Sequence, residues 1–273
     1  LVTGSGFYDG PGATYGSTWV YELNVPLFVR WDTEYDSNAG FLSGDGKYHV
    51  NNNCIVYYED SGAWVITSST GVTSSYQNRV SINHDGSRIV CVDSTTTNLV
   101  HVIDRSGSGA SSTWTTSATI SHTSANYLDA EIAMTNDDII VIGDDSDTPT
   151  IYEYDGSSWV ATWAGSSNGG KYGYAVSISG DGQFVVVGDY SGESVELYTK
   201  VSGTWTNVYE YDASDGVGHD GGESGDRTAF DHAITVSNEK VIMVVGAPRN
   251  NVGGTNSGEV RVFEQNTAGD YTS

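Results

Sequence analysis

Three short strand patterns and the beginning of a fourth follow one another between Tyr172 and Trp205, and this stretch constrains the fold more than any other part of the chain. Its first and third patterns alternate small or apolar residues with polar ones, which is typical of half-buried strands. The second pattern is almost wholly apolar, as expected of a strand buried on both faces. The four expected strands are Ala175–Ser179, Phe184–Gly188, Val195–Tyr198 and Trp205 to about Tyr211.

Short polar segments separate these strands and predict turns. Gly180–Gln183 contains the residue types that tolerate the positive φ of a hairpin turn. Ser191–Gly192 predicts a second turn, and Lys200–Gly203 predicts a polar loop. Asp181 is therefore interpreted as a turn residue rather than as a metal ligand.

Weaker copies of this pattern run along the whole chain, at about 1–36, 37–71, 72–121, 122–168, 169–218 and 219–273. Four strands per repeat are the signature of a β-propeller, whose blades are four-stranded sheets. We therefore predict an all-β fold with one propeller domain over residues 1–273. Six blades is the simplest count, and seven blades would need residues beyond this sequence. The first copy begins with the second strand of the repeat, and the sixth copy ends where the fourth strand of the repeat begins. The strands expected in the first copy are Leu1–Gly4, Val20–Leu23 and Leu27–Trp31.

An aromatic residue opens the fourth strand in most copies. A single blade cannot bury both of its faces and depends on its neighbours. We therefore predict that these aromatic side chains pack between blades and do not stack on a ligand. The residues at this position are Trp64, Trp114, Trp159, Trp205 and Tyr271.

The charge of the chain argues against two classes of binding partner. It has 35 acidic residues against 11 Lys and Arg, which gives a formal net charge of −24. Nucleic acid and anionic membranes attract basic patches, so neither is an expected partner. No stretch is apolar enough to span a membrane.

The sequence contains two cysteines, Cys54 and Cys91, which we expect in strands of neighbouring repeats. Two cysteines are too few for a disulfide framework or a zinc site. We expect two separate buried thiols, and a single bridge is the alternative.

The sixth copy carries a more specific pattern. Phe230–Phe263 contains Val244–Pro248, a polar loop and Ser257–Phe263, and it resembles an FG-GAP repeat of the kind that builds the propeller of integrin α-chain heads. The entry Tyr172–Val176 resembles the Phe-Gly half of that motif. The other copies keep the strand pattern more than the motif. The resemblance implies an extracellular, cell-surface or virion-surface protein.

Integrin-type repeats often bind Ca²⁺ in the loop between the first and second strands, because this cation prefers six to eight oxygen ligands. Those loops are too short here to form such a site. Two other acidic loops could hold Ca²⁺, although the fold requires no cofactor. Their candidate ligands are Asp144, Asp145 and Asp147 in one loop, and Asp215, Asp220, Glu223 and Asp226 in the other.

The sequence contains no Gly-x-Ser-x-Gly elbow, His-Glu-x-x-His pair or phosphate loop. We therefore predict a non-enzymatic module for adhesion, receptor binding or assembly, with an extracellular protein or glycan as partner. One alternative is a purely structural block of a fibre, sheath or capsid decoration that binds copies of itself or other structural proteins. A second alternative is a lectin or a glycan-active enzyme. Recognition would use the longest loops, which are Ser106–Thr113, Asp212–Arg227 and Arg249–Gly258.

Overall fold

The computed structural model describes residues 2–10, 13–21, 40–74, 79–93, 95–96, 99–122, 131–135, 138–144, 148–166, 172–189, 194–212, 232–237, 240–247, 259–265 and 271–272. The chain divides into two compact units, Leu1–Thr123 and Ser124–Ser273. Apart from one short 3₁₀ helix, every element of the described residues is a β-strand, so the all-β prediction is confirmed.

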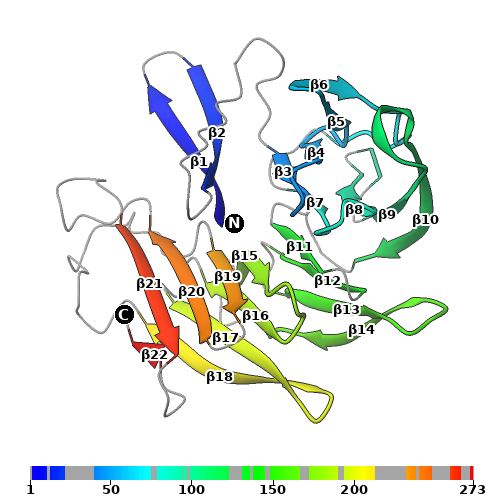
Figure 1. Cartoon of the computed structure of the whole chain (residues 1–273). Coiled ribbons are helices and arrows are strands. Elements are labelled where there is room, and N and C mark those ends of the chain that lie inside the picture. Colours follow the sequence, from blue (N-terminus) through cyan, green and yellow to red (C-terminus); the bar gives the residue numbers. More distant parts are fainter. Residues whose placement is uncertain are drawn as a thin grey trace. The chain divides into compact units, whose positions relative to one another are not determined.

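The first unit contains a hairpin and two four-stranded antiparallel sheets (Figure 1). In both sheets the strands are hydrogen-bonded in chain order. The hairpin is formed by β1 (Val2–Gly10) and β2 (Ala13–Tyr21). The sheets are formed by β3 (Gly40–Leu42), β4 (Tyr48–Asn51), β5 (Val56–Asp60) and β6 (Ala63–Ile66), and by β7 (Val80–Ile82), β8 (Arg88–Val92), β9 (Leu99–Ser106) and β10 (Thr113–Ser121).

The hairpin corrects the strand limits expected for the first copy. The strand predicted over Leu1–Gly4 continues to Gly10, and its partner β2 ends at Tyr21. The strand expected over Leu27–Trp31 lies outside the described residues. The long antiparallel register between β1 and β2 was not visible in the sequence, because glycines interrupt the alternation of both strands.

The second unit contains three sheets of the same topology (Figure 1). Each of the five four-stranded sheets among the described residues lies inside one of the last five predicted repeats. The limits of the domain and the number of blades stay predictions. The strands of this unit are β11 (Ile132–Met134), β12 (Ile139–Ile142), β13 (Thr150–Tyr154) and β14 (Trp159–Ala164); β15 (Tyr172–Ile178), β16 (Phe184–Asp189), β17 (Ser194–Val201) and β18 (Thr204–Asp212); and β19 (His232–Ser237), β20 (Lys240–Ala247), β21 (Glu259–Gln265) and β22 (Tyr271–Thr272).

The turn after β15 confirms the interpretation of Asp181. Its Oδ1 accepts hydrogen bonds from the hydroxyl of Ser179 (2.6 Å) and from the backbone amide of Gln183 (3.1 Å). The positive φ is taken by Gly182, at 69°, where a side chain would be strained. The turn after β3 repeats this arrangement, with Asp45 in the place of Asp181.

The loop predicted over Lys200–Gly203 is shorter than expected. β17 continues through Val201, and only Ser202 and Gly203 turn the chain into β18. Both residues have positive φ, 50° and 84°, as a two-residue type I′ hairpin requires. Lys200 was assigned to the loop because it is polar, although it belongs to β17.

The second strand of each sheet supplies the centre of the core. Val185, Val186 and Val187 in β16 are fully buried, and so are their counterparts in β12. The prediction of a strand buried on both faces is therefore confirmed. One apolar cluster joins residues of β12 and β13 to residues of β15, β16 and β17, so that successive sheets bury each other's faces.

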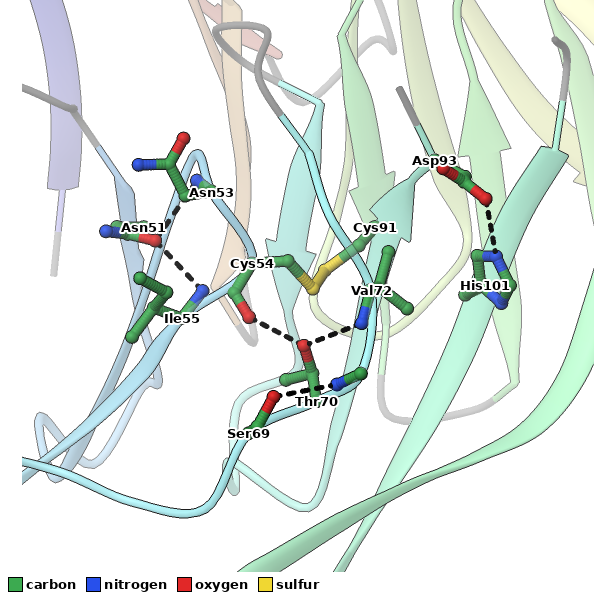
Figure 2. The surroundings of a disulfide bond; sticks show 11 residues. Asn51, Asn53, Cys54, Ile55, Ser69, Thr70, Val72, Cys91, Asp93 and His101 are labelled. Atoms are coloured by element: carbon green, nitrogen blue, oxygen red, sulfur yellow. Dashed lines mark hydrogen bonds and ion pairs between the residues drawn. A yellow bond between two sulfur atoms is a disulfide. The ribbon is translucent and has the colours of Figure 1, made fainter. Parts of the chain in front are cut away.

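A disulfide bond joins the two sheets of the first unit (Figure 2). Cys54 and Cys91 are bonded, with their Cα atoms 6.1 Å apart. The expectation of two separate thiols is wrong. Cys54 lies in the connection between β4 and β5 and not in a strand, and this connection brings its backbone within bonding reach of β8 in the next sheet.

Candidate functional site

Three contacts between neighbouring sheets use aromatic residues that open the fourth strands. Trp114 in β10 donates a hydrogen bond from Nε1 to Thr67, just after β6 (3.0 Å). Trp205 in β18 donates from Nε1 to Glu153 in β13 (2.9 Å). The ring of Tyr271 lies 4.9 Å from that of Tyr209 in the preceding sheet, measured between centroids.

These three contacts confirm the predicted packing between blades. The described contacts of the other two residues are within their own sheets: Trp64 lies edge-on to His49 and Trp159 lies beside Tyr154. For Trp64 and Trp159, packing between blades stays a prediction.

Glu153 is the centre of a charged contact between two sheets. Its carboxylate lies 2.5 Å from the ammonium of Lys200 and accepts a hydrogen bond from the hydroxyl of Thr162 (2.9 Å). Partial burial acts to raise the pKa of Glu153, but the donors Lys200, Trp205 and Thr162 outweigh it and hold the pKa below its usual value. The cluster stabilises the sheet packing and leaves little of this carboxylate for a ligand.

The loop over Ser106–Thr113, one of the three proposed for recognition, packs on the preceding sheet. It contains the 3₁₀ helix η1 (Gly109–Ser111). The hydroxyl of Tyr48 in β4 accepts a hydrogen bond from the amide of Gly109 (2.8 Å) and shares another with Ser112 (3.0 Å). This loop therefore serves the contact between sheets. The other two loops lie outside the described residues, except for Asp212 at the end of β18.

Acidic residues end the second strand in three sheets. Asp93 follows β8, Asp144 follows β12 by two residues, and Asp189 ends β16. Asp144 and Asp189 are buried, with exposed fractions of 0% and 6%. Acidic residues at equivalent places in successive repeats are the best candidates for a functional site among the described residues.

Of the predicted calcium ligands, only Asp144 is among the described residues. Its backbone amide donates to the carbonyl of Gly173 (3.1 Å), and its side chain is fully buried. The others, Asp145, Asp147, Asp215, Asp220, Glu223 and Asp226, lie outside the described residues. No group of three or more His, Cys, Asp and Glu side chains with metal-binding geometry occurs in the part of the chain that the structure describes. Calcium binding stays a prediction.

Asp93 forms the most organised of these sites. One carboxylate oxygen accepts from the amide (2.7 Å) and the hydroxyl (2.6 Å) of Thr95. The other lies 3.5 Å from Nε2 of His101 in β9 (Figure 2). Partial burial acts to raise the pKa of Asp93, but the hydrogen bonds from Thr95, Thr96 and His101 outweigh it and lower the pKa to about 2. Asp93 is therefore a stable carboxylate that orients the imidazole.

Neither Asp93 nor His101 was found from the sequence. Their contact depends on the register of β8 and β9, which the sequence does not show. A signal for the carboxylates was present, because aligned repeats end their second strands in Val92-Asp93, Gly143-Asp144 and Gly188-Asp189. Of these three carboxylates, only Asp144 was given a role from the sequence, as a calcium ligand, and Asp93 and Asp189 were not.

Solved structures resemble this chain over nearly its whole length. A protein of Bacteroides fragilis, named as a candidate 6-phosphogluconolactonase, is 15% identical, with a TM-score of 0.61; the match covers 98% of this chain and 79% of that one. A Lactobacillus plantarum protein is 15% identical, with a TM-score of 0.59, and the match covers 98% of this chain and 79% of that one. The periplasmic gluconolactonase PpgL of Pseudomonas aeruginosa is 14% identical, with a TM-score of 0.57, and the match covers 94% of this chain and 77% of that one. These structures are β-propellers.

The chain has a β-propeller fold. Its four-stranded sheets are the blades, and we number each blade by the repeat that contains it. No family model matches the chain, the FG-GAP repeat included, and no curated protein sequence matches it. At these identities the similarity shows the fold and not the activity. No helix among the described residues is long and apolar enough to cross a membrane.

Proposed function

We propose that this propeller is a non-enzymatic binding module that works outside the cytoplasm, at a cell surface, at a virion surface or in the medium. The Cys54–Cys91 disulfide carries the proposal. Disulfides persist in oxidising compartments and are rare in reducing ones. The bond joins blades 2 and 3, so it belongs to the architecture of the propeller.

The charge supports the same setting. A net charge of −24 repels nucleic acid and anionic membranes and keeps separate copies apart. The partners that we propose are therefore extracellular proteins or glycans. The module would bind them in adhesion, in receptor binding or in assembly. Membership of the FG-GAP type is part of this proposal and rests on the motif of the sixth copy.

Recognition is assigned to the loops that differ between blades. The aromatic residues that recur in the blades are used in packing at Trp114, Trp205 and Tyr271. Variable loops on a rigid scaffold are the usual place for binding residues. We therefore assign recognition to residues 213–227 and 249–258.

A glycan array and a screen of extracellular protein domains test the proposal. Each is run with the wild-type chain and with a variant in which Gly-Ser linkers of equal length replace residues 213–227 and 249–258. We expect a ligand that the wild type binds and the variant does not. A matched linker in the Ser106–Thr113 loop is a poor control, because it would break the Tyr48 contacts. Gly180→Ala at the β15–β16 turn is a better one, because an added Cβ there meets no other atom within 4 Å. Equal binding by wild type and loop variant would contradict the assignment.

Hydrolysis of a sugar lactone is the second candidate, since two of the similar structures carry lactonase names. A pH-indicator assay with δ-gluconolactone separates the two functions. The binding-module proposal predicts a rate equal to that of a heat-denatured sample. Turnover above that background would replace the proposal with the enzymatic one.

A further inference from the structure

Two buried tyrosines fix a carboxylate on the face of blade 5 that packs against blade 4. Oε2 of Glu196 in β17 accepts hydrogen bonds from the hydroxyls of Tyr172 in β15 (2.7 Å) and of Tyr198 in β17. Both tyrosine side chains are buried in the apolar cluster that joins the two blades. Burial, and after it the hydrogen bonds with Glu196, raise the pKa of both tyrosines, so both stay protonated and donate. Glu196 is therefore held in one orientation.

The second oxygen of this half-buried carboxylate is open. Oε1 of Glu196 makes no hydrogen bond within the described part of the chain, and it is not one of the buried atoms there. The same holds for Nε1 of Trp163 in β14 of blade 4. The ring of Trp163 lies 4.7 Å from that of Tyr198, measured between centroids. An acceptor and a donor are thus open to solvent, and Tyr198 contacts both of the residues that carry them.

Glu196 does not belong to the repeated architecture of the blades. Its direct cross-strand partner is Glu210, five residues after Trp205. The pairs at the same distance from Trp114 and Trp159 in blades 3 and 4 are His101–Thr119 and Thr150–Ala164. Positions that vary on a rigid scaffold are the usual place for binding residues, so Glu196 is a candidate for recognition.

The two open atoms select a class of ligand. A carboxylate oxygen only accepts a hydrogen bond, and an indole N–H only donates one. A cation would be attracted by Glu196 but cannot accept the N–H of Trp163, and an anion would be repelled by Glu196 and Glu210. A hydroxyl group both donates and accepts. Neighbouring hydroxyls of a sugar ring therefore match both atoms.

We propose that a neutral saccharide binds where blades 4 and 5 meet, with hydroxyl groups that donate to Oε1 of Glu196 and accept from Nε1 of Trp163. Tyr172 and Tyr198 are positioning residues, because they hold Glu196 and are themselves buried. The site deepens the proposed function, on which it rests for the choice of a glycan as partner. It adds a contact outside residues 213–227 and 249–258.

A glycan array that carries neutral oligosaccharides beside sialylated and sulfated ones tests the site. It is probed with the wild type, Glu196→Gln and Trp163→Phe, and circular dichroism checks that each variant is folded. Glutamine keeps an oxygen for the two tyrosine hydroxyls but offers an amide in place of Oε1, and phenylalanine keeps a ring beside Tyr198 but lacks the N–H. Because a hydrogen bond to a charged group contributes more than a neutral one, we expect about tenfold weaker binding of a neutral glycan by Glu196→Gln and about threefold weaker binding by Trp163→Phe.

Glu264→Gln is the matched control, because Glu264 is an exposed carboxylate of a strand in blade 6. It should bind the glycan as the wild type does. Binding to sialylated or sulfated glycans alone, or to no glycan, would overturn the site, while the screen of protein domains would still test the proposed function. A neutral glycan that Glu196→Gln and Trp163→Phe bind within twofold of the wild type would also overturn the site. If the variant with linkers at 213–227 and 249–258 loses that glycan, the proposed function stands without this site.

Discussion

His49 should make the stability of the protein depend on mildly acidic pH. The imidazole is 4% exposed in β4, and its ring lies beside those of Tyr57 and Trp64. Burial lowers the pKa of His49 from 6.5 to about 4, because the charged form is poorly solvated there. The unfolded chain therefore binds a proton between these two values that the folded chain does not bind.

The size of the effect follows from proton linkage. A group with a depressed histidine pKa in the folded state destabilises the fold as the pH falls through the unfolded pKa. With values of 6.5 and about 4, the free energy of unfolding falls by about 2 kcal/mol between pH 7.5 and pH 5, and by about 3 kcal/mol below pH 4. Above pH 7 the effect vanishes, because both states are neutral.

Urea unfolding followed by tryptophan fluorescence measures this difference at pH 7.5 and pH 5 in the wild type and in His49→Gln. The variant controls for the carboxylates, which titrate in both proteins. The wild type should lose about 2 kcal/mol more than the variant over this interval. Equal losses in the two proteins would refute the reasoning that burial sets the protonation of His49.

Three further predictions concern the packing of the blades and their ions. Trp205→Ala should lower the free energy of unfolding by about 3–5 kcal/mol, because it leaves a cavity and removes a donor from Glu153; a urea midpoint like that of the wild type would count against the packing of Trp205 between blades. Cys91→Ser should cost about 4 kcal/mol in the chain-entropy relation, since the bond spans 37 residues; an unchanged calorimetric transition would show that it contributes nothing. Chelation with EDTA should leave the melting temperature unchanged, because the fold is expected to require no cofactor; a lower value, restored by Ca²⁺, would favour the acidic loops as calcium sites.

Local patterns were enough to predict most of the strands. The apolar run at Phe184 and the turn at Asp181 depend on neighbours in the sequence, and both were confirmed. The packing of Trp205 between blades was predicted because its position recurs from repeat to repeat. Repetition thus supplied information about contacts that a single segment could not.

Contacts that depend on the geometry between blades could not be predicted. The bond between Cys54 and Cys91 needs a connection that carries Cys54 out of its strand and within 6.1 Å of the next blade, measured between Cα atoms. The pairing of Asp93 with His101 lies within one blade and needs the register of β8 and β9, which the sequence does not show. Neither distance follows from hydrophobic periodicity, which reports only the face of each residue.

The state of the cysteines in the protein as its source produces it tests the proposed setting most directly. The chain is isolated without reductant, with free thiols blocked during lysis, then unfolded, alkylated and digested for mass spectrometry. The account predicts one cross-linked peptide that joins Cys54 to Cys91, and no alkylation at either residue. Full alkylation at both residues would contradict it, since the observation on which the proposed setting outside the cytoplasm rests would then be absent.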